Sequence, residues 1–395
     1  MIKKTLFFLT LVSVLATCTP TQMDQMETIE YSVLQWENGN FSDIYKFLSS
    51  DVDDDTVQDI IKLFFFLDKN ITFRITALEY ITVDPNNHPV KASGLVFHPL
   101  NRKSRGVFDS FPTAHIGGSG PSDVLYAVEG LMVFLGYTVI VPDFLGFGVS
   151  KETMSPFLMT ENTGRVAYDM RRAAAQYLWD AFRYELPAET TIMGYSLGGS
   201  AALSAQKFYE TYHANTVKVK EVHAGGGAYD LPVAFATFSK TGVSDYPSIP
   251  NAFLAFDHYY HLNIDFEQVF TGALLDYYHD WYSGSYNLAQ MMEHLGSDLH
   301  AYMHPDFFKP FDLQNDEIKK IHPFLIENSV SEGWCPKAPV YLSHARVDTY
   351  VPVACAQAAV SKFRKAGANI SLTLYPGTHN TVGYHHFVRM ALHYL

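Results

Sequence analysis

Residues 189–204 read Glu-Thr-Thr-Ile-Met-Gly-Tyr-Ser-Leu-Gly-Gly-Ser-Ala-Ala-Leu-Ser: a short apolar run, a serine between glycines and an immediate helical stretch. Gly194, Tyr195, Ser196, Leu197 and Gly198 fit the pattern Gly-x-Ser-x-Gly, in which a serine sits on a sharp strand-to-helix turn without space for side chains at the glycine positions. Such a turn exposes the serine as a nucleophile. It also aims the Leu197 backbone N–H and the positive end of the following helix at a developing oxyanion. Five residues alone could form a structural turn, but their place between a predicted strand and helix favours catalysis.

Strands and helices alternate on both sides of this turn. Strand-like runs lie at residues 71–83, 90–98, 137–143, 217–224, 338–344 and 370–375, with helical stretches at 122–135, 164–185, 354–365 and after 380. This alternation predicts a mainly parallel central sheet with helices on both faces. Loops beyond the carboxyl ends of such strands carry the functional residues, and we call this edge of the sheet the working edge. We therefore expect the loops that contain His115, Ser196 and Asp230 to meet there.

Residues 231–334 interrupt the alternation and are rich in aromatic residues and histidine. We interpret them as a cap of helices and loops inserted over the working edge. The cap histidines lack the paired i, i+4 spacing with a third ligand that is typical of zinc sites, so no metal site is predicted. The chain thus divides into residues 1–18 (signal), 19–70 (tether and N-terminal helical extension), 71–230 (first part of the core), 231–334 (cap) and 335–395 (second part of the core).

A serine hydroxyl becomes a strong nucleophile when a histidine removes its proton and an acid orients that histidine. Asp348 and His379 both follow the serine, each in a loop after a later predicted strand, which is the required order. His379 comes just after Gly377 and is expected on an exposed loop. These two residues are therefore predicted to complete a catalytic triad with Ser196.

Other acids and histidines compete for these roles. Asp143 precedes the serine and Asp230 leads into the cap, so structural roles are expected for both. His344 lies within a predicted strand, and His385 and His386 lie within the last predicted helix. Their positions favour Asp348 and His379 over all five.

The second oxyanion donor is expected in the loop after the strand near residue 111, which runs His115-Ile116-Gly117-Gly118. The sequence leaves Ile116 and Gly117 as alternative donors. His115, which shapes this loop, and Tyr195, beside the serine, are predicted to contribute to substrate binding.

The first residues predict export. Lys3 and Lys4 precede an apolar run, and Cys18 follows Leu-Ala-Thr, an arrangement similar to the lipidation motif of bacterial lipoproteins. This resemblance implies a lipid anchor on Cys18, a membrane partner and a location in the bacterial cell envelope, on the periplasmic or cell-surface side of the outer membrane. An ordinary cleaved signal or an uncleaved anchor is the alternative. The segment that follows is predicted to be a polar tether and then a helix at residues 56–67.

The amino-acid composition argues against one class of binding partner, the polyanions. The 395-residue chain is 48% hydrophobic and has a formal charge of -13, so a polyanion-binding surface of clustered Lys and Arg is not expected, and nucleic acid is excluded as a partner. Cys335 and Cys355 lie on either side of a predicted strand, which places them too far apart for a disulfide. We expect two free thiols. The sequence leaves the oligomeric state open.

From about residue 90 onward the chain resembles α/β-hydrolases, and more narrowly it is similar to the secretory lipase family. The resemblance rests on several motifs, which are His115 with its glycines, 141–148 (Val-Pro-Asp-Phe-Leu-Gly-Phe-Gly), 169–174 (Asp-Met-Arg-Arg-Ala-Ala), 194–199, 226–231 and the Asp348 and His379 loops. Ile116 between His115 and Gly117, and Ala345 before the acid, depart from the usual pattern. The resemblance implies carboxylic ester hydrolysis through an acyl-enzyme, without a metal or organic cofactor.

The leading hypothesis is a lipid-anchored serine esterase for small to medium acyl esters, such as acylated sugars, phenolic esters or lipids. A serine peptidase of the same fold is the alternative, although no motif of paired glutamates or arginine that would capture a peptide terminus is evident. A non-catalytic binding protein is disfavoured because Ser196, Asp348 and His379 are all present.

Overall fold

The computed structural model describes residues 28–48, 69–113 and 118–395. The signal segment with Cys18, the helix predicted at 56–67, and His115, Ile116 and Gly117 lie outside the described residues. The strands are β1 (Tyr31–Asn40), β2 (Thr72–Val83), β3 (Pro89–Pro99), β4 (Val107–Phe111), β5 (Thr138–Pro142), β6 (Glu189–Tyr195), β7 (Lys218–Gly225), β8 (Val340–Ala345) and β9 (Ile370–Tyr375). The α-helices of the core are α2 (Ile44–Leu48), α4 (Pro121–Val124), α5 (Thr160–Phe182), α6 (Leu197–Tyr212), α13 (Val353–Lys365) and α14 (His379–His393), with the 3-10 helix η3 (Val128–Leu135).

One sheet runs through the core in the order β1-β2-β3-β5-β4-β6-β7-β8-β9. The pairs from β5 to β9 are parallel, whereas β1, β2 and β3 pair antiparallel with each other and β3 pairs antiparallel with β5. The predicted mainly parallel sheet is therefore confirmed. Because Phe111 pairs with Gly194, and Tyr195 with Gly225, the loops after β4, β6 and β7 start side by side at one edge.

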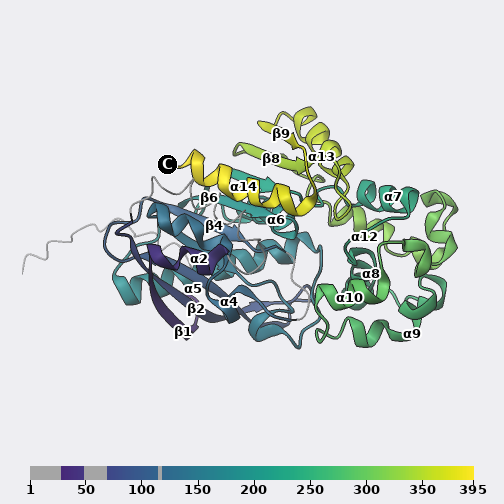
Figure 1. Cartoon of the computed structure of the whole chain (residues 1–395), viewed down its shortest axis with the longest axis horizontal. Coiled ribbons are helices and arrows are strands. Elements are labelled where there is room, and N and C mark those ends of the chain that lie inside the picture. Colours follow the sequence, from purple (N-terminus) through teal and green to yellow (C-terminus); the bar gives the residue numbers. More distant parts are fainter. Residues whose placement is uncertain (1–27, 49–68, 114–117) are drawn as a thin grey trace, which may run out of the picture.

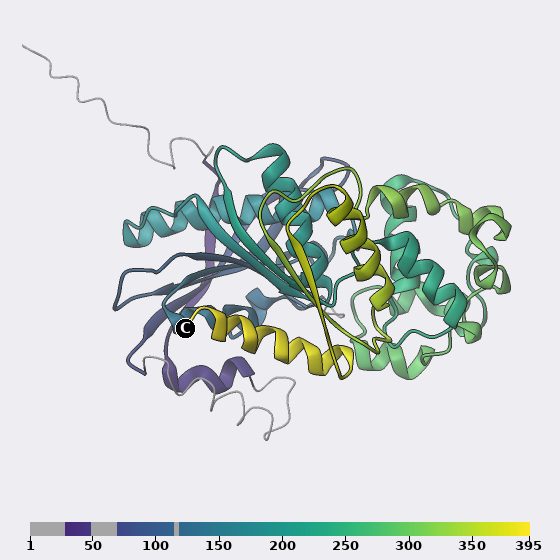
Figure 2. The ribbon, with the colours of Figure 1, turned by 90° about the horizontal axis from the view of Figure 1, so that it is seen from above.

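Helices cover both faces of the sheet (Figure 2). On one face α5, α6 and α13 pack against buried aliphatic and aromatic side chains of β4 to β8. On the other face η3, α2 and α14 close a second cluster that includes Phe73, Phe97 and Phe108. Strand β6 lies in the middle, and Thr190–Tyr195 is buried throughout, which explains why its sequence reads as one apolar run.

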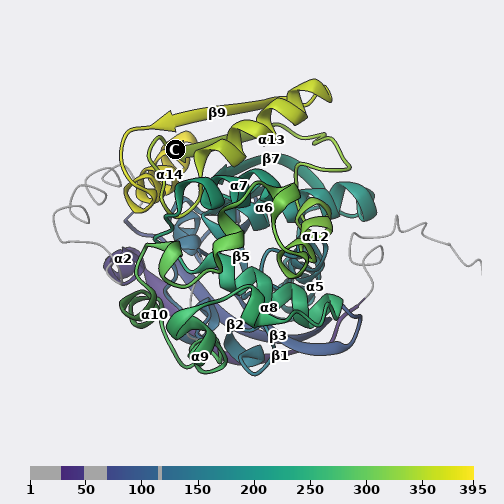
Figure 3. The same cartoon turned by 90° about the vertical axis from the view of Figure 1, so that its right-hand side faces the viewer.

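Between β7 and β8 the described chain is helical and forms the lobe at the right of Figure 1, which faces the viewer in Figure 3. Its α-helices are α7 (Leu231–Thr241), α8 (Ser248–Tyr260), α9 (Gly272–Trp281), α10 (Leu288–Leu295), α11 (Asp316–Lys319) and α12 (His322–Glu327). The lobe has its own hydrophobic cluster, in which Phe253, Phe256 and Phe270 are fully buried. The aromatic residues of this segment therefore build a core of their own as well as a wall over the sheet edge.

Two features differ from the predictions. Residues 31–40 were assigned to a polar tether but form the edge strand β1, which is held by backbone pairing to β2 rather than by a buried face, so its side chains are mostly exposed. The single helix expected at 122–135 is split into α4 and η3 by Leu125, whose φ of 64° ends α4. Cys335 and Cys355 are free thiols, as expected. Within the described ranges, no helix has the length and apolar character needed to cross a bilayer.

Candidate active site

The serine turn joins β6 to α6 with strained backbone geometry. Ser196 has φ 59° and ψ -125°, a conformation that L-residues rarely adopt. A Cβ atom on Gly194 would lie 2.2 Å from the Gly198 carbonyl oxygen, and one on Gly198 would lie 2.4 Å from the Phe111 carbonyl oxygen. Both positions therefore require glycine, as the sequence pattern indicated, and the turn holds Ser196 beyond the end of β6.

Ser196, His379 and Asp348 form a continuous hydrogen-bonded row. His379 Nε2 lies 2.8 Å from Ser196 Oγ, and His379 Nδ1 lies 2.8 Å from Asp348 Oδ2. Asp348 follows β8, and His379 follows β9, so both arrive at the edge where the β6 turn ends. This geometry suits proton transfer from the serine to the imidazole, with the carboxylate fixing the imidazole tautomer.

Asp348 is buried and held on several sides. Its Oδ1 accepts hydrogen bonds from the backbone N–H groups of Tyr350 (3.0 Å) and Val351 (2.8 Å). His344 Nε2 lies 3.3 Å from Oδ2. Burial alone would raise the pKa of Asp348, but hydrogen bonds from His344 and His379 outweigh it and hold the pKa well below its usual value. The group therefore stays ionised beside His379. His344, a rejected candidate for the base, instead helps to hold the acid.

His379 is placed differently from the expectation of an exposed loop. It is the first residue of α14 and only 4% exposed. The Tyr350 ring stacks on the imidazole with ring centroids 4.9 Å apart and an interplanar angle of 3°. Thr378 caps the helix by accepting from the Thr381 N–H, and this start of the helix fixes the direction of the His379 side chain.

Tyr195 also departs from its predicted role. Its side chain is buried, its hydroxyl donates to the His379 carbonyl oxygen at 2.6 Å, and its ring lies 5.1 Å from the imidazole. Alternation along β6 turns Tyr195 under the histidine rather than toward the cavity beside Ser196. Tyr195 is not among the described residues that line the cavity beside Ser196, and its contacts are those of a residue that positions His379.

The other rejected candidates have structural partners. Asp143 accepts from Ser93 and Ser122 hydroxyls at 2.5 Å each, and burial raises its pKa to about 6. Asp230 caps α7 and pairs with Lys362 Nζ at 2.6 Å. His386 bonds Ser343 Oγ at 2.8 Å.

An apolar cavity opens beside Ser196 under the cap. It encloses about 530 Å³ including its open mouth, and the residues that line it are Phe157, Leu158, Ser196, Leu197, Ser200, Ala228, Leu231, Ala234, Phe235, Phe238, Tyr246, Ser248, Tyr350 and Val351. A second space of about 520 Å³ continues from it along α5 and shares the walls formed by Leu158, Leu197 and Leu231. None of the described residues that line either space is charged. The apolar lining is typical of a small-molecule site.

The structure describes one of the expected oxyanion donors, the backbone N–H of Leu197. Leu197 is the first residue of α6, so its N–H has no partner within the helix, and it lies directly after Ser196 on the cavity wall. Ile116 and Gly117, the alternative second donors, lie outside the described residues.

Comparison with known proteins places this site in a family. The model of the secretory lipase family matches residues 124–392, which is most of the chain. The chain belongs to the secretory lipase family. A secretory lipase is a serine ester hydrolase, so the predicted hydrolase class is confirmed. Family membership also indicates an extracellular or cell-envelope location.

Solved structures agree with this assignment at the level of the fold. A protein from Legionella pneumophila is 19% identical with a TM-score of 0.77, and the match covers 93% of this chain and 98% of that chain. A mutant of the rice cell wall degrading esterase LipA from Xanthomonas oryzae is 20% identical with a TM-score of 0.74, covering 95% and 97%. Candida antarctica lipase A is 19% identical with a TM-score of 0.57, covering 91% and 79%. All three comparisons confirm the α/β-hydrolase fold. None of the curated proteins compared with this secretory lipase matches it.

Proposed function

We propose that this secretory lipase cleaves small to medium acyl esters through an acyl-enzyme formed on Ser196. His379 Nε2, at 2.8 Å, takes the serine proton as Oγ attacks the ester carbonyl and then gives it to the departing alcohol. Asp348 holds Nδ1 and stabilises the imidazolium. A water molecule, activated by the same imidazole, then attacks the acyl-enzyme and releases the acid.

The oxyanion of each tetrahedral intermediate is held by backbone N–H groups. We assign one donor to Leu197, at the positive end of α6, and the second to Ile116 or Gly117. His115, in the same loop, is retained as a proposed contributor to the substrate site.

The observation that carries the substrate class is the lining of the cavity beside Ser196. Aliphatic and aromatic side chains of α7, among them Leu231, Phe235 and Phe238, line the cavity together with Ser196. An acyl chain would bury its methylenes there, at about 0.8 kcal/mol for each CH₂ removed from water.

The same lining disfavours the peptidase alternative. A peptidase that captures a chain terminus needs a charged side chain in the site, because a buried ammonium or carboxylate without a partner is costly. None of the described cavity residues offers one. The intact hydrogen-bonded row from Ser196 to Asp348 likewise disfavours a protein that only binds its ligand.

The alcohol group of the natural ester is to be identified by substrate screening. One structural neighbour is a rice cell wall degrading esterase, and acylated sugars and phenolic esters from plant cell walls are therefore natural candidates beside lipids. We further propose that a lipid on Cys18 anchors the enzyme in a bacterial cell envelope, which is supported by the sequence of the first 18 residues.

The test is hydrolysis of a p-nitrophenyl ester series from acetate to palmitate by the chain without residues 1–18. We expect Ser196→Ala to abolish turnover and Ser361→Ala, an exposed serine on α13, to leave it unchanged. Phe238→Leu should shift the optimum to longer acyl chains, whereas Phe363→Leu, a buried phenylalanine away from the cavity, should not. Turnover that survives Ser196→Ala, or cleavage of aminoacyl anilides in place of esters, would overturn the proposal.

A further inference from the structure

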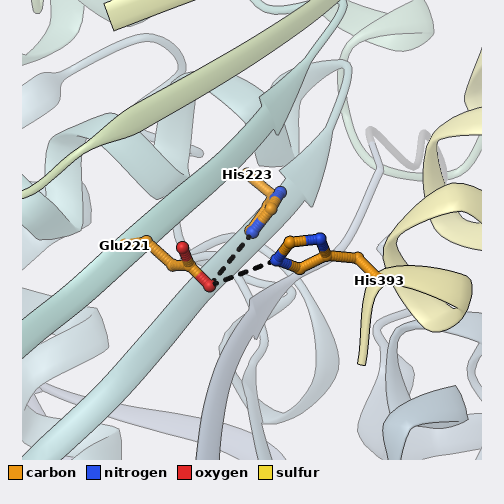
Figure 4. A group of neighbouring side chains, drawn as sticks. All are labelled: Glu221, His223 and His393. Carbon is orange, nitrogen blue, oxygen red and sulfur yellow. Dashed lines mark ion pairs between the residues drawn. The ribbon is translucent and has the colours of Figure 1, made fainter. Parts of the chain in front are cut away.

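Two histidines and a glutamate converge on the side of the sheet covered by α14. Glu221 and His223 come from β7, and His393 is the last residue of α14 (Figure 4). Glu221 Oε1 lies 3.6 Å from His223 Nε2 and 3.9 Å from His393 Nε2. Both imidazole nitrogens therefore face one carboxylate oxygen. Among the described residues, this is the group of three whose ligand atoms all lie within 4.8 Å of one another.

The group is separate from the active site. His379 begins α14 and His393 ends it, so a rise of 1.5 Å per residue puts roughly 21 Å of helix between them. The cap histidines considered from the sequence take no part. A metal-ligand pattern was not visible in the sequence because His393 is far from the β7 residues along the chain.

One nitrogen of this group, His223 Nε2, lacks a hydrogen bond. His223 Nε2 is buried and has no hydrogen-bond partner among the described residues, since 3.6 Å from Oε1 is too long for one. Zinc binds imidazole nitrogen at about 2.0–2.1 Å and carboxylate oxygen at about 2.0–2.2 Å, so its ligand atoms in a tetrahedral site stand roughly 3.3–3.6 Å apart. The His223 separation of 3.6 Å fits this interval, and the His393 separation of 3.9 Å lies a few tenths of an ångström beyond it.

The surroundings leave room for adjustment. His393 is 59% exposed, so its ring is able to turn toward His223 without disturbing the core. His223 is fixed by stacking on Tyr341, with ring centroids 5.1 Å apart. Tyr394 also donates its hydroxyl to Glu221 Oε1, and the oxygen retains a second lone pair for a cation.

We propose that Glu221, His223 and His393 bind a divalent transition metal ion, with Zn²⁺ the best fit, and that the ion fastens the end of α14 to β7. Two neutral imidazoles and one carboxylate form a donor set that zinc accepts, and water supplies the fourth ligand at the exposed side. The role is structural, because the ion would lie far from Ser196 and would tie the helix that carries His379 to the sheet.

One positive charge opposes the ion. Lys220, the bulge residue of β7, has its ammonium 5.6 Å from the centre of the Tyr394 ring. This charge weakens cation binding, so the expected affinity is micromolar rather than that of a closed four-ligand site.

The test uses the full soluble chain after removal of metal with a chelator. Zn²⁺ is titrated by calorimetry, and thermal unfolding is followed with and without the ion. We expect one Zn²⁺ for each chain and a rise in Tm of roughly 3 °C at about 100 times Kd. His393→Ala should lose both effects. His300→Ala is the matched control, because His300 is also 59% exposed and also faces a carboxylate, Asp298, at 2.9 Å.

His393 is exposed, so His393→Ala should fold, and its Tm without metal checks that it does. Wild-type protein that binds no Zn²⁺, or His393→Ala that binds it as tightly as wild type, would overturn the proposal. A loss of binding in His300→Ala that equals the loss in His393→Ala would also overturn it, since binding would then be spread over surface histidines.

Discussion

The hydroxyl of Tyr195 donates to the His379 carbonyl oxygen at 2.6 Å in a buried site, and Tyr195→Phe removes that hydrogen bond while keeping the ring. If Tyr195 positions His379, the variant should lose kcat and stability together, with KM for all acyl lengths unchanged. If Tyr195 contacted substrate instead, KM would change and would depend on the acyl chain.

The size of the effect follows from burial. Loss of one buried hydrogen-bond partner costs about 1–3 kcal/mol. At about 2.1 cal/mol/K per residue, the unfolding entropy of a chain of 395 residues is roughly 0.8 kcal/mol/K, so Tm should fall by about 1–4 °C. A shift of a few tenths of an ångström in the imidazole should lower kcat roughly tenfold.

Calorimetry and ester turnover on Tyr195→Phe measure both quantities. Tyr302→Phe is the control, because Tyr302 is buried in the cap and its hydroxyl has no hydrogen-bond partner among the described residues. We expect Tyr302→Phe to leave kcat unchanged within error and not to lower Tm, because it removes a buried hydroxyl without a hydrogen-bond partner. The reasoning is refuted if Tyr195→Phe matches this control in both measurements, or if its KM rises with acyl length while kcat is constant.

Three further predictions concern the catalytic carboxylate Asp348, the start of helix α7 at Asp230, and stability at low pH. Asp348→Asn should lower ester turnover about 10³–10⁴-fold, because an amide no longer fixes the imidazole tautomer; a loss below tenfold would contradict the proposed role. Asp230→Ala removes the N-terminal capping residue of helix α7 and the ion pair with Lys362, which is 41% exposed. The free energy of unfolding measured in urea should fall by about 2 kcal/mol, and a fall under about 0.5 kcal/mol would contradict this structural role of Asp230. Burial lowers the pKa of His98 to about 4, below the unfolded value near 6.5, so the unfolded state binds more protons between these values and stability falls as pH drops. From pH 7 to 5 this histidine should cost about 2 kcal/mol of unfolding free energy. The variant His98→Gln should remove this loss, whereas His88→Gln, at an exposed turn, should not.

The sequence was most informative where one residue type satisfies a local requirement. Gly194 and Gly198 are forced by backbone oxygens closer than 2.5 Å to any added Cβ, so the turn was readable from spacing alone. The parallel strands were readable because strands buried on both faces form continuous apolar runs. Asp348 and His379 could be selected by chain order, since each lies after a later strand.

Features that depend on distant partners were not readable. Strand β1 is polar and exposed, and pairing with β2 holds it at the sheet edge. The helical start at His379 depends on a Thr378 cap and on the Tyr350 ring above it. The contact of Tyr195 with His379 joins residues 184 positions apart, so no local pattern indicated it.

Helix α14 connects these observations. Its first residue is His379, and its last is His393, which faces Glu221 on β7. The N-terminal end is held by Tyr195 from β6 below the imidazole, and the C-terminal end by the Tyr394 hydroxyl on Glu221. One helix therefore carries His379 at its first residue and the proposed metal ligand at its last, and each end is held by a contact to the sheet, through Tyr195 of β6 and Glu221 of β7.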